Sequence, residues 1–273
     1  MNATDFRTCP VTARRIHRPA ETLVKANAVV AVVSLLIGAI AAVLLVLTRW
    51  QAVHLLPAEW FYRILGVHGM SMLIFFIIFY EMAVLIFAST ALINARIAAP
   101  KLGWAAFALM LGGATLVEVI MWAGKADVLF TSYVPLKADP LYYLGIILFA
   151  VGALLVCGIF FANLVVAQRE QTYTGSLPLV VYGAVTAAII AVITLLHGAA
   201  IYIPTFLWSM GWMNVDPEVY RLMFWALGHA SQQINVAAMV SVWYLMGGLT
   251  IGAVVLNEKV SRWAFVLYVL FIS

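Results

Sequence analysis

The sequence predicts an all-α, polytopic transmembrane helix bundle with six complete spans and the start of a seventh. Two features of composition indicate this class: 66% of the 273 residues are hydrophobic and only 10% are charged. Soluble domains are roughly 45–50% apolar and about 25% charged, so a soluble domain and a disordered chain are both excluded. The third observation is a series of long uncharged runs, because about 20 helical residues cross a bilayer. The net charge of +4 is too small to indicate a nucleic-acid partner.

The first 25 residues form a polar segment without the early apolar stretch of a secretory signal. A single transmembrane domain is expected to fill residues 26–273. Its apolar runs must be helices, because a chain in lipid satisfies its own backbone hydrogen bonds and these runs exceed the length of barrel strands. The runs cover residues 26–47, 64–93, 102–124, 141–167, 178–208 and 219–256, and a last one opens at Trp263.

Proline-containing turns separate the runs and predict where helices start. They are Ala-Pro-Lys at 99–101, Asp-Pro at 139–140, Ser-Leu-Pro at 176–178 and Asp-Pro at 216–217. The last run has room for only about 11 residues, roughly half a bilayer. We therefore expect a domain truncated at its C-terminus; the alternative is a short amphipathic tail lying in the interface.

The distribution of basic residues predicts a cytoplasmic N-terminus. With that orientation the inner segments hold ten lysines and arginines and the outer segments hold five. The inner ten are Arg7, Arg14, Arg15, Arg18, Lys25, Arg96, Lys101, Arg169, Lys259 and Arg262, and the outer five are Arg49, Arg63, Lys125, Lys137 and Arg221.

Three histidines fall within spans, where ionisable groups are costly and indicate a site. His68, His197 and His229 are each placed toward the outer side of the membrane. Imidazole is a common ligand of metals and haem, and histidines at one depth on different helices can ligate metals inside a bundle. The alternative is a hydrogen bond from each histidine to a neighbouring helix.

The sixth run carries a strip of polar residues, comprising His229, Ser231, Gln232, Gln233 and Asn235. Such a strip must face protein, water or a cofactor, so it indicates either interhelical hydrogen bonds or a buried reaction chamber.

Two carboxylates, Glu81 and Glu118, also lie within spans, near opposite faces. They are candidates for proton relays, or for interfacial groups that reach water.

The sixth run opens with a motif that resembles the catalytic subunit of the haem–copper oxidase superfamily, subunit I of cytochrome c oxidase and its relatives. Residues 216–229 read DPEVYRLMFWALGH, and the family reads D-P-x-x-Y, then F-W, then G-H. Three further pieces occur in the family's order. They are V-H-G-M at 67–70, Y-V-P-L at 133–136 and T-G-S-L-P-L at 174–179. The resemblance covers residues 60 to 256.

The resemblance implies a role for two of the histidines. His68 would be an axial ligand of a low-spin haem, and His229 would be the first histidine ligand of the copper that faces a high-spin haem. Electrons would pass through the low-spin haem to the haem–copper centre, where O2 is reduced with protons from the cytoplasmic side. His197 matches no ligand of the family. The family's remaining ligands come from its seventh and tenth helices, so they would lie beyond residue 273.

One departure from the family pattern keeps a second substrate open. Many oxidases carry a tyrosine four residues after the copper histidine, whereas this chain has Gln233. Nitric oxide reductases of the superfamily also lack that tyrosine, and some oxidases place it on the seventh helix. Oxygen is the expected substrate and nitric oxide the alternative; a non-catalytic membrane subunit or transporter is a further alternative.

The resemblance also implies partners and a location. The partners are membrane lipid, other oxidase subunits and an electron donor such as cytochrome c or quinol. The expected location is a prokaryotic cytoplasmic membrane, where the enzyme would serve aerobic respiration.

Overall fold

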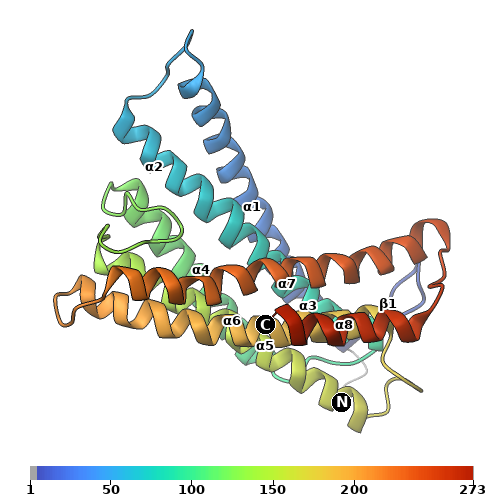
Figure 1. The fold of residues 1–273 in the computed structure, drawn as a ribbon. Helices are drawn as coiled ribbons and strands as arrows, with labels where there is room; N and C mark the ends of the chain where they lie inside the picture. The colour runs from blue at the N-terminus through green and yellow to red at the C-terminus, as the bar shows by residue number, and fades with distance from the viewer. Residues whose placement is uncertain (1–4, 273) are drawn as a thin grey trace.

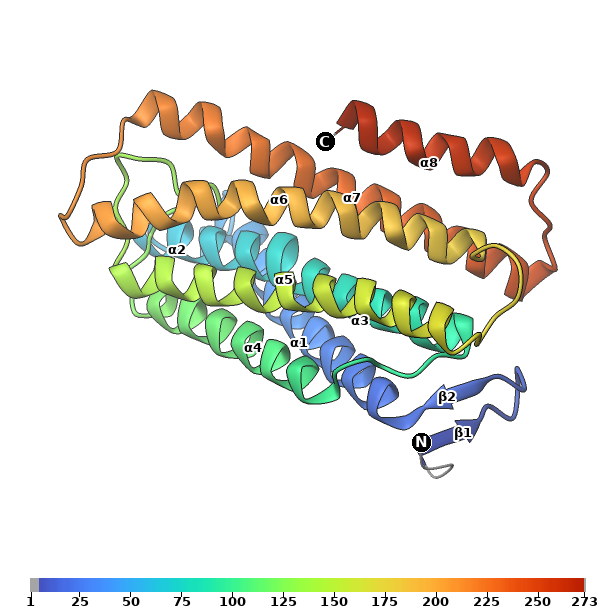
Figure 2. The same cartoon turned by 90° about the horizontal axis from the view of Figure 1, so that it is seen from below.

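The computed structural model describes residues 5–272 and confirms a helical membrane bundle (Figures 1 and 2). Within this described part of the chain, six helices are long and apolar enough to cross a membrane. They are α1 (Arg18–Arg49), the continuous span Ala58–Ile93, α4 (Pro100–Trp122), α5 (Pro140–Arg169), α6 (Leu179–Ser209) and α7 (Pro217–Ile251). A shorter helix, α8 (Glu258–Ile272), follows and starts five residues before Trp263.

The predicted polar segment contains regular structure that its composition did not indicate. Strands β1 (Phe6–Thr8) and β2 (Arg15–His17) form an antiparallel hairpin, with Phe6 opposite His17. Helix α1 begins at Arg18, inside the predicted polar segment, and Pro19 occupies its first turn. The Arg7 Nε donates to Glu21 of α1 over 2.7 Å, which ties the hairpin to the bundle. We call this side the N-terminal end of the bundle and the opposite side the far end.

The second span consists of four consecutive helical segments. Helix α2 (Ala58–Gly69) passes into the π-helix η2 (Met70–Phe76), then α3 (Ile77–Thr90) and the 3₁₀ turn η3 (Ala91–Ile93). The span starts at Ala58, six residues before the apolar run that begins at residue 64. The apolar run begins later than the helix because the charged residues Glu59 and Arg63 lie in the first turns of the helix. A π-helix is uncommon and is frequent at functional sites.

The proline signals mark helix starts, as the sequence predicts. Pro100, Pro140 and Pro217 each occupy the first position of a helix, where no backbone N–H is needed. Pro178 directly precedes α6. The Asp139 and Asp216 side chains accept hydrogen bonds from backbone N–H groups of the first turns of α5 and α7, at 2.9 Å.

The helices pack mainly with their neighbours in sequence: α4 along α5, α6 along α7, and α1 along α2 and α3. In Figure 1, α1 and α2 diverge from α6 and α7 toward the far end. Figure 2 shows α8 folded back beside α6 and α7, and it packs chiefly on α6.

Glycines allow α4 and α5 to approach closely, as in other membrane helix pairs. A Cβ atom at Gly152 would lie 2.6 Å from the Ala106 carbonyl oxygen and 2.9 Å from the Met110 backbone nitrogen. These are backbone atoms of the facing helix and cannot rotate away. Gly158 lies on the same helix, and a Cβ atom there would meet nothing within 4 Å.

We expect Gly152→Ala to lower the free energy of unfolding by about 1–3 kcal/mol, because the methyl group forces α4 and α5 apart. Gly158→Ala is the matched control and should be neutral or slightly stabilising, since alanine favours a helix over glycine. Thermal or denaturant unfolding in detergent measures both. Equal effects of the two substitutions would contradict the close packing.

Candidate functional site

His68 lies near the end of α2, ten residues after Ala58, and its imidazole is held by a neighbouring helix. Its Nδ1 lies 2.9 Å from the Gly38 carbonyl oxygen of α1. A carbonyl only accepts, so Nδ1 carries the proton and Nε2 keeps its lone pair. Metal-bound histidines usually have this arrangement, with one nitrogen bonded to a carbonyl and the other bound to the metal. The His68 ring therefore fits a role as a ligand through Nε2.

Gly38 makes the close approach of α1 to His68 possible. A Cβ atom at Gly38 would lie 2.6 Å from the Met72 sulfur and 3.4 Å from the Ser71 Cβ. A larger residue would have to displace the Met72 side chain in the segment that follows His68. Nothing in the sequence near His68 indicates this partner, because Gly38 lies 30 positions earlier within an apolar run.

Arg63 anchors the first turns of α2, five residues before His68. Its guanidinium donates to Asp127 at 3.0 and 3.1 Å and to Glu59 at 3.0 Å, and it lies 4.7 Å from the centre of the Trp60 ring. The Arg63 residue is 8% exposed, so its charge is largely removed from solvent and needs these partners. The bonds to Asp127 attach α2 to the loop that follows α4.

Glu118 of α4 lies beside the π-helix and bonds to it. The Ser71 hydroxyl donates to one Glu118 carboxyl oxygen over 2.7 Å, whereas the buried Oε2 has no partner. The sequence identified Glu118 as a carboxylate within a span, and the structure adds the serine that holds it.

His229 lies on α7, twelve residues after Pro217, and its side chain is exposed. His197 of α6 is exposed as well. Four residues after His229, the Gln233 side-chain oxygen accepts a hydrogen bond from the Tyr268 hydroxyl of α8. A phenol thus contacts the position where many oxidases have their tyrosine.

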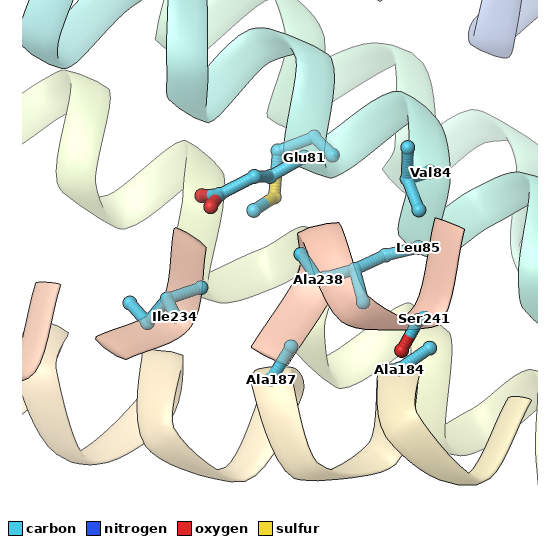
Figure 3. A pocket seen from close by; sticks show the side chains of 9 residues that line it. Glu81, Val84, Leu85, Ala184, Ala187, Ile234, Ala238 and Ser241 are labelled. Atoms are coloured by element: carbon cyan, nitrogen blue, oxygen red, sulfur yellow. The ribbon is translucent and has the colours of Figure 1, made fainter. Parts of the chain in front are cut away.

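The residues of the polar strip of α7 differ in their surroundings, because some line a cavity and others do not. Ser231, Gln232 and Asn235 line a cavity of about 180 Å³ between the second span, α5, α6 and α7. Glu81 of α3 and Thr194 of α6 line the same cavity, whose remaining walls are mostly apolar. Figure 3 shows the neighbouring small pocket, where the Glu81 carboxyl group points toward the Ile234 side.

Neither His68 nor His229 belongs to a cluster of candidate metal ligands within the described chain. Among residues 5–272, no group of three histidine, cysteine, aspartate or glutamate side chains is arranged to hold a metal ion. His17 is buried under the hairpin, where its Nδ1 accepts from the Ile97 N–H at 3.4 Å and burial lowers its pKa.

Comparisons with known proteins agree with the arrangement of the helices. A family model described as "Cytochrome C and Quinol oxidase polypeptide I" matches residues 22–273. Cytochrome c oxidase subunit 1 of Thermus thermophilus is 27% identical over 225 residues, which are 80% of this chain and 39% of that protein.

A solved structure of a heme-copper terminal oxidase dimer has the same fold, with a TM-score of 0.84 at 21% identity. The match covers 92% of this chain and 44% of the solved one. This chain therefore spans less than half the length of either relative.

Proposed function

The chain belongs to the cytochrome c and quinol oxidase polypeptide I family, and from this premise we propose that it forms part of the catalytic subunit of a respiratory enzyme that reduces O2. The family implies an oxidoreductase of the membrane with haem and copper as cofactors. Family membership is the observation that carries the proposal. The environment of His68 and the contact between Tyr268 and Gln233 support it.

We propose that His68 is an axial ligand of a low-spin haem. The bond from Nδ1 to the Gly38 carbonyl supports this role, because it leaves Nε2 free and fixes the plane of the ring. Arg63, Asp127 and Gly38 act as positioning residues, since they hold α2 against its neighbours. When bound, the haem supplies one-electron chemistry.

We propose that His229 is a ligand of copper. Its ring is exposed and therefore available to a metal ion. The preceding residue, Gly228, lines the cavity of about 180 Å³ between the helices. When bound, the copper ion supplies an electron and acts as a Lewis acid.

Oxygen is favoured as the substrate because a phenol lies next to Gln233. The Tyr268 hydroxyl donates to the Gln233 side-chain oxygen, so it has a partner when it carries its proton. A phenol in this place can supply the extra electron and proton that reduction of O2 demands.

We further propose that the enzyme lies in a prokaryotic cytoplasmic membrane, with the N-terminal end of the bundle inside. Partner subunits would surround it, and electrons would come from cytochrome c or quinol. The basic residues of the hairpin support the orientation, because cytoplasmic segments are rich in lysine and arginine.

The three membrane histidines provide a test with an internal control. In the holoenzyme purified from its native membrane, His68→Ala should remove the low-spin haem absorbance, because the iron loses a ligand. His229→Ala should keep that absorbance and lose copper in metal analysis. His197→Ala should change neither, although it is also exposed within a span. Unchanged haem absorbance in His68→Ala would contradict the assignment.

Tyr268→Phe should lower O2 consumption at least about tenfold while leaving haem and copper content unchanged, because only the phenolic proton is removed. Tyr80→Phe is the control, since Tyr80 is an exposed tyrosine of another span. An oxygen electrode measures the rate. An enzyme that consumes nitric oxide and no O2 would show that the substrate assignment is wrong.

Cys9 tests the orientation of the N-terminal hairpin. Hydrogen bonds from Thr12 lower the pKa of the Cys9 thiol to about 7, so its reactive thiolate becomes abundant as the pH rises through 7. We expect a membrane-impermeant maleimide to label it from the cytoplasmic face only. Cys157 is fully buried in α5 and should stay unlabelled from either face. Labelling of Cys9 in intact cells would reverse the proposed orientation.

A further inference from the structure

Glu81 is a buried carboxylic acid that the chemistry proposed for the histidines does not use. It lies on α3, is 7% exposed, and its Oε1 atom has no hydrogen-bond partner. No ion pair of the described residues includes it. An unpaired carboxylate is costly in an apolar interior, so a carboxyl group in this place holds a proton or contacts water.

Two adjoining cavities meet at Glu81. The smaller one has a volume of about 10 Å³, which is close to the space that one water molecule needs. It extends along α3, α6 and α7 to the Ser241 hydroxyl, which lies toward the N-terminal end. The larger cavity, of about 180 Å³, extends toward the far end. Glu81 lines both, as do Met82 and Ile234.

The Glu81 carboxyl group points toward the Ile234 side of the small pocket, away from Val84 and Leu85 (Figure 3). On that side, the larger cavity is lined by three residues of the polar strip of α7, namely Ser231, Gln232 and Asn235. These residues lie two to six positions after His229. Their hydroxyl and amide groups can donate and accept, so they can hold water molecules between Glu81 and the part of α7 that carries His229.

The groups that face Glu81 from the surrounding helices are neutral. The α6 helix contributes Thr194 and the Tyr202 phenol to the cavity walls, α7 contributes its amides and hydroxyls, and α5 places the Cys157 thiol within electrostatic reach. Among the described residues that line the two cavities, Glu81 is the one carboxylate, and none is a lysine, arginine or histidine. A proton that moves through this space therefore has Glu81 as its acid–base group.

We propose that Glu81 is a proton-relay residue that passes protons from the N-terminal end of the bundle to the cavity beside His229. The proposal rests on the proposed function, which requires protons at the site where the substrate is reduced. In the step, the O–H bond of the Glu81 carboxylic acid breaks and the proton joins a water oxygen in the larger cavity. The carboxylate then takes a proton from a water molecule on the Ser241 side, and the hydroxide so formed takes a proton that arrives from the N-terminal end. No electron moves in either transfer.

The test compares Glu81→Gln with Glu81→Asp in the holoenzyme. Glutamine has the same shape and cannot relay a proton by ionising, so turnover should fall about 100-fold or more. Proton uptake from the medium after the reduced enzyme meets O2 should lose its fast phase, whereas haem absorbance should stay unchanged. Aspartate keeps the carboxyl group and should restore most of the fast uptake, which a purely structural role would not produce.

Glu218→Gln is the matched control: the same substitution at an exposed glutamate in the first turn of α7, at the far end and outside both cavities. It should leave proton uptake unchanged. Wild-type rates and uptake in Glu81→Gln, in an enzyme that binds haem and consumes O2, would overturn the relay and leave the proposed function standing. A wild-type enzyme without haem or O2 consumption would instead overturn the proposed function.

A second measurement tests the proposal even if the Glu81→Gln enzyme fails to assemble. Infrared difference spectra during reduction should show the carbonyl band of a protonated carboxylic acid in the wild type. That band should shift in Glu81→Asp, because its origin is the Glu81 side chain. A band that is unmoved in Glu81→Asp, or absent from the wild type, would contradict the proposal.

Discussion

The structure depends on one constraint: every polar group placed within lipid needs a partner inside the protein. Asn163 shows how strictly the chain meets it. Its Nδ2 donates to the Ser89 hydroxyl over 2.9 Å, and its Oδ1 accepts from the Ala98 backbone N–H at 2.7 Å. One side chain thus satisfies the turn between η3 and α4 and binds α5 to α3. Threonines such as Thr194 bond to a carbonyl of their own helix, at 2.7 Å.

The same constraint gives weight to the few exceptions. Within the described chain, the buried side-chain atoms without a partner are Asn27 Oδ1, Glu81 Oε1 and Glu118 Oε2. The Asn27 side-chain amide donates a hydrogen bond to the Leu23 carbonyl oxygen, and Asn27 lines neither cavity beside Glu81. The structure therefore indicates no function for its unpaired oxygen. Glu118 has Ser71 as a donor. Glu81 alone combines a missing partner with space on both sides, which is what a group that exchanges protons requires.

Local sequence patterns predicted the features that depend on neighbouring residues, above all the starts of helices. Proline and aspartate marked the starts of α4, α5 and α7, because both act within the first helical turn. The beginning of the second span escaped prediction, since Arg63 interrupts the apolar run and its partner Asp127 lies 64 residues away. The Gly38 carbonyl at His68 escaped for the same reason. A contact between distant segments leaves no periodic signal, and a glycine in an apolar run has many possible explanations.

The sequence predicted individual residues of the candidate site but not the way they are arranged in space. His68 and His229 could be named from their motifs, and their roles remain proposals. The cavity between the helices could not be foreseen, because its walls come from four spans whose packing the sequence does not specify. The small hairpin was also missed, because its two strands have three residues each and lack an alternating apolar pattern.

The π-helix connects the two side chains of the second span for which we propose a function. His68 and Glu81 occupy this span, thirteen residues apart, and η2 lies between them. A regular helix turns by about 100° per residue, so one residue taken up by a π segment rotates everything after it by about that angle. The ring at position 68 faces the Gly38 carbonyl of α1, whereas the carboxyl group at position 81 faces the cavity beside α6 and α7. The widened turn thus sets the angle between the side chain proposed as a haem ligand and the one proposed as a proton relay. A single span can then serve both purposes, each against a different neighbour.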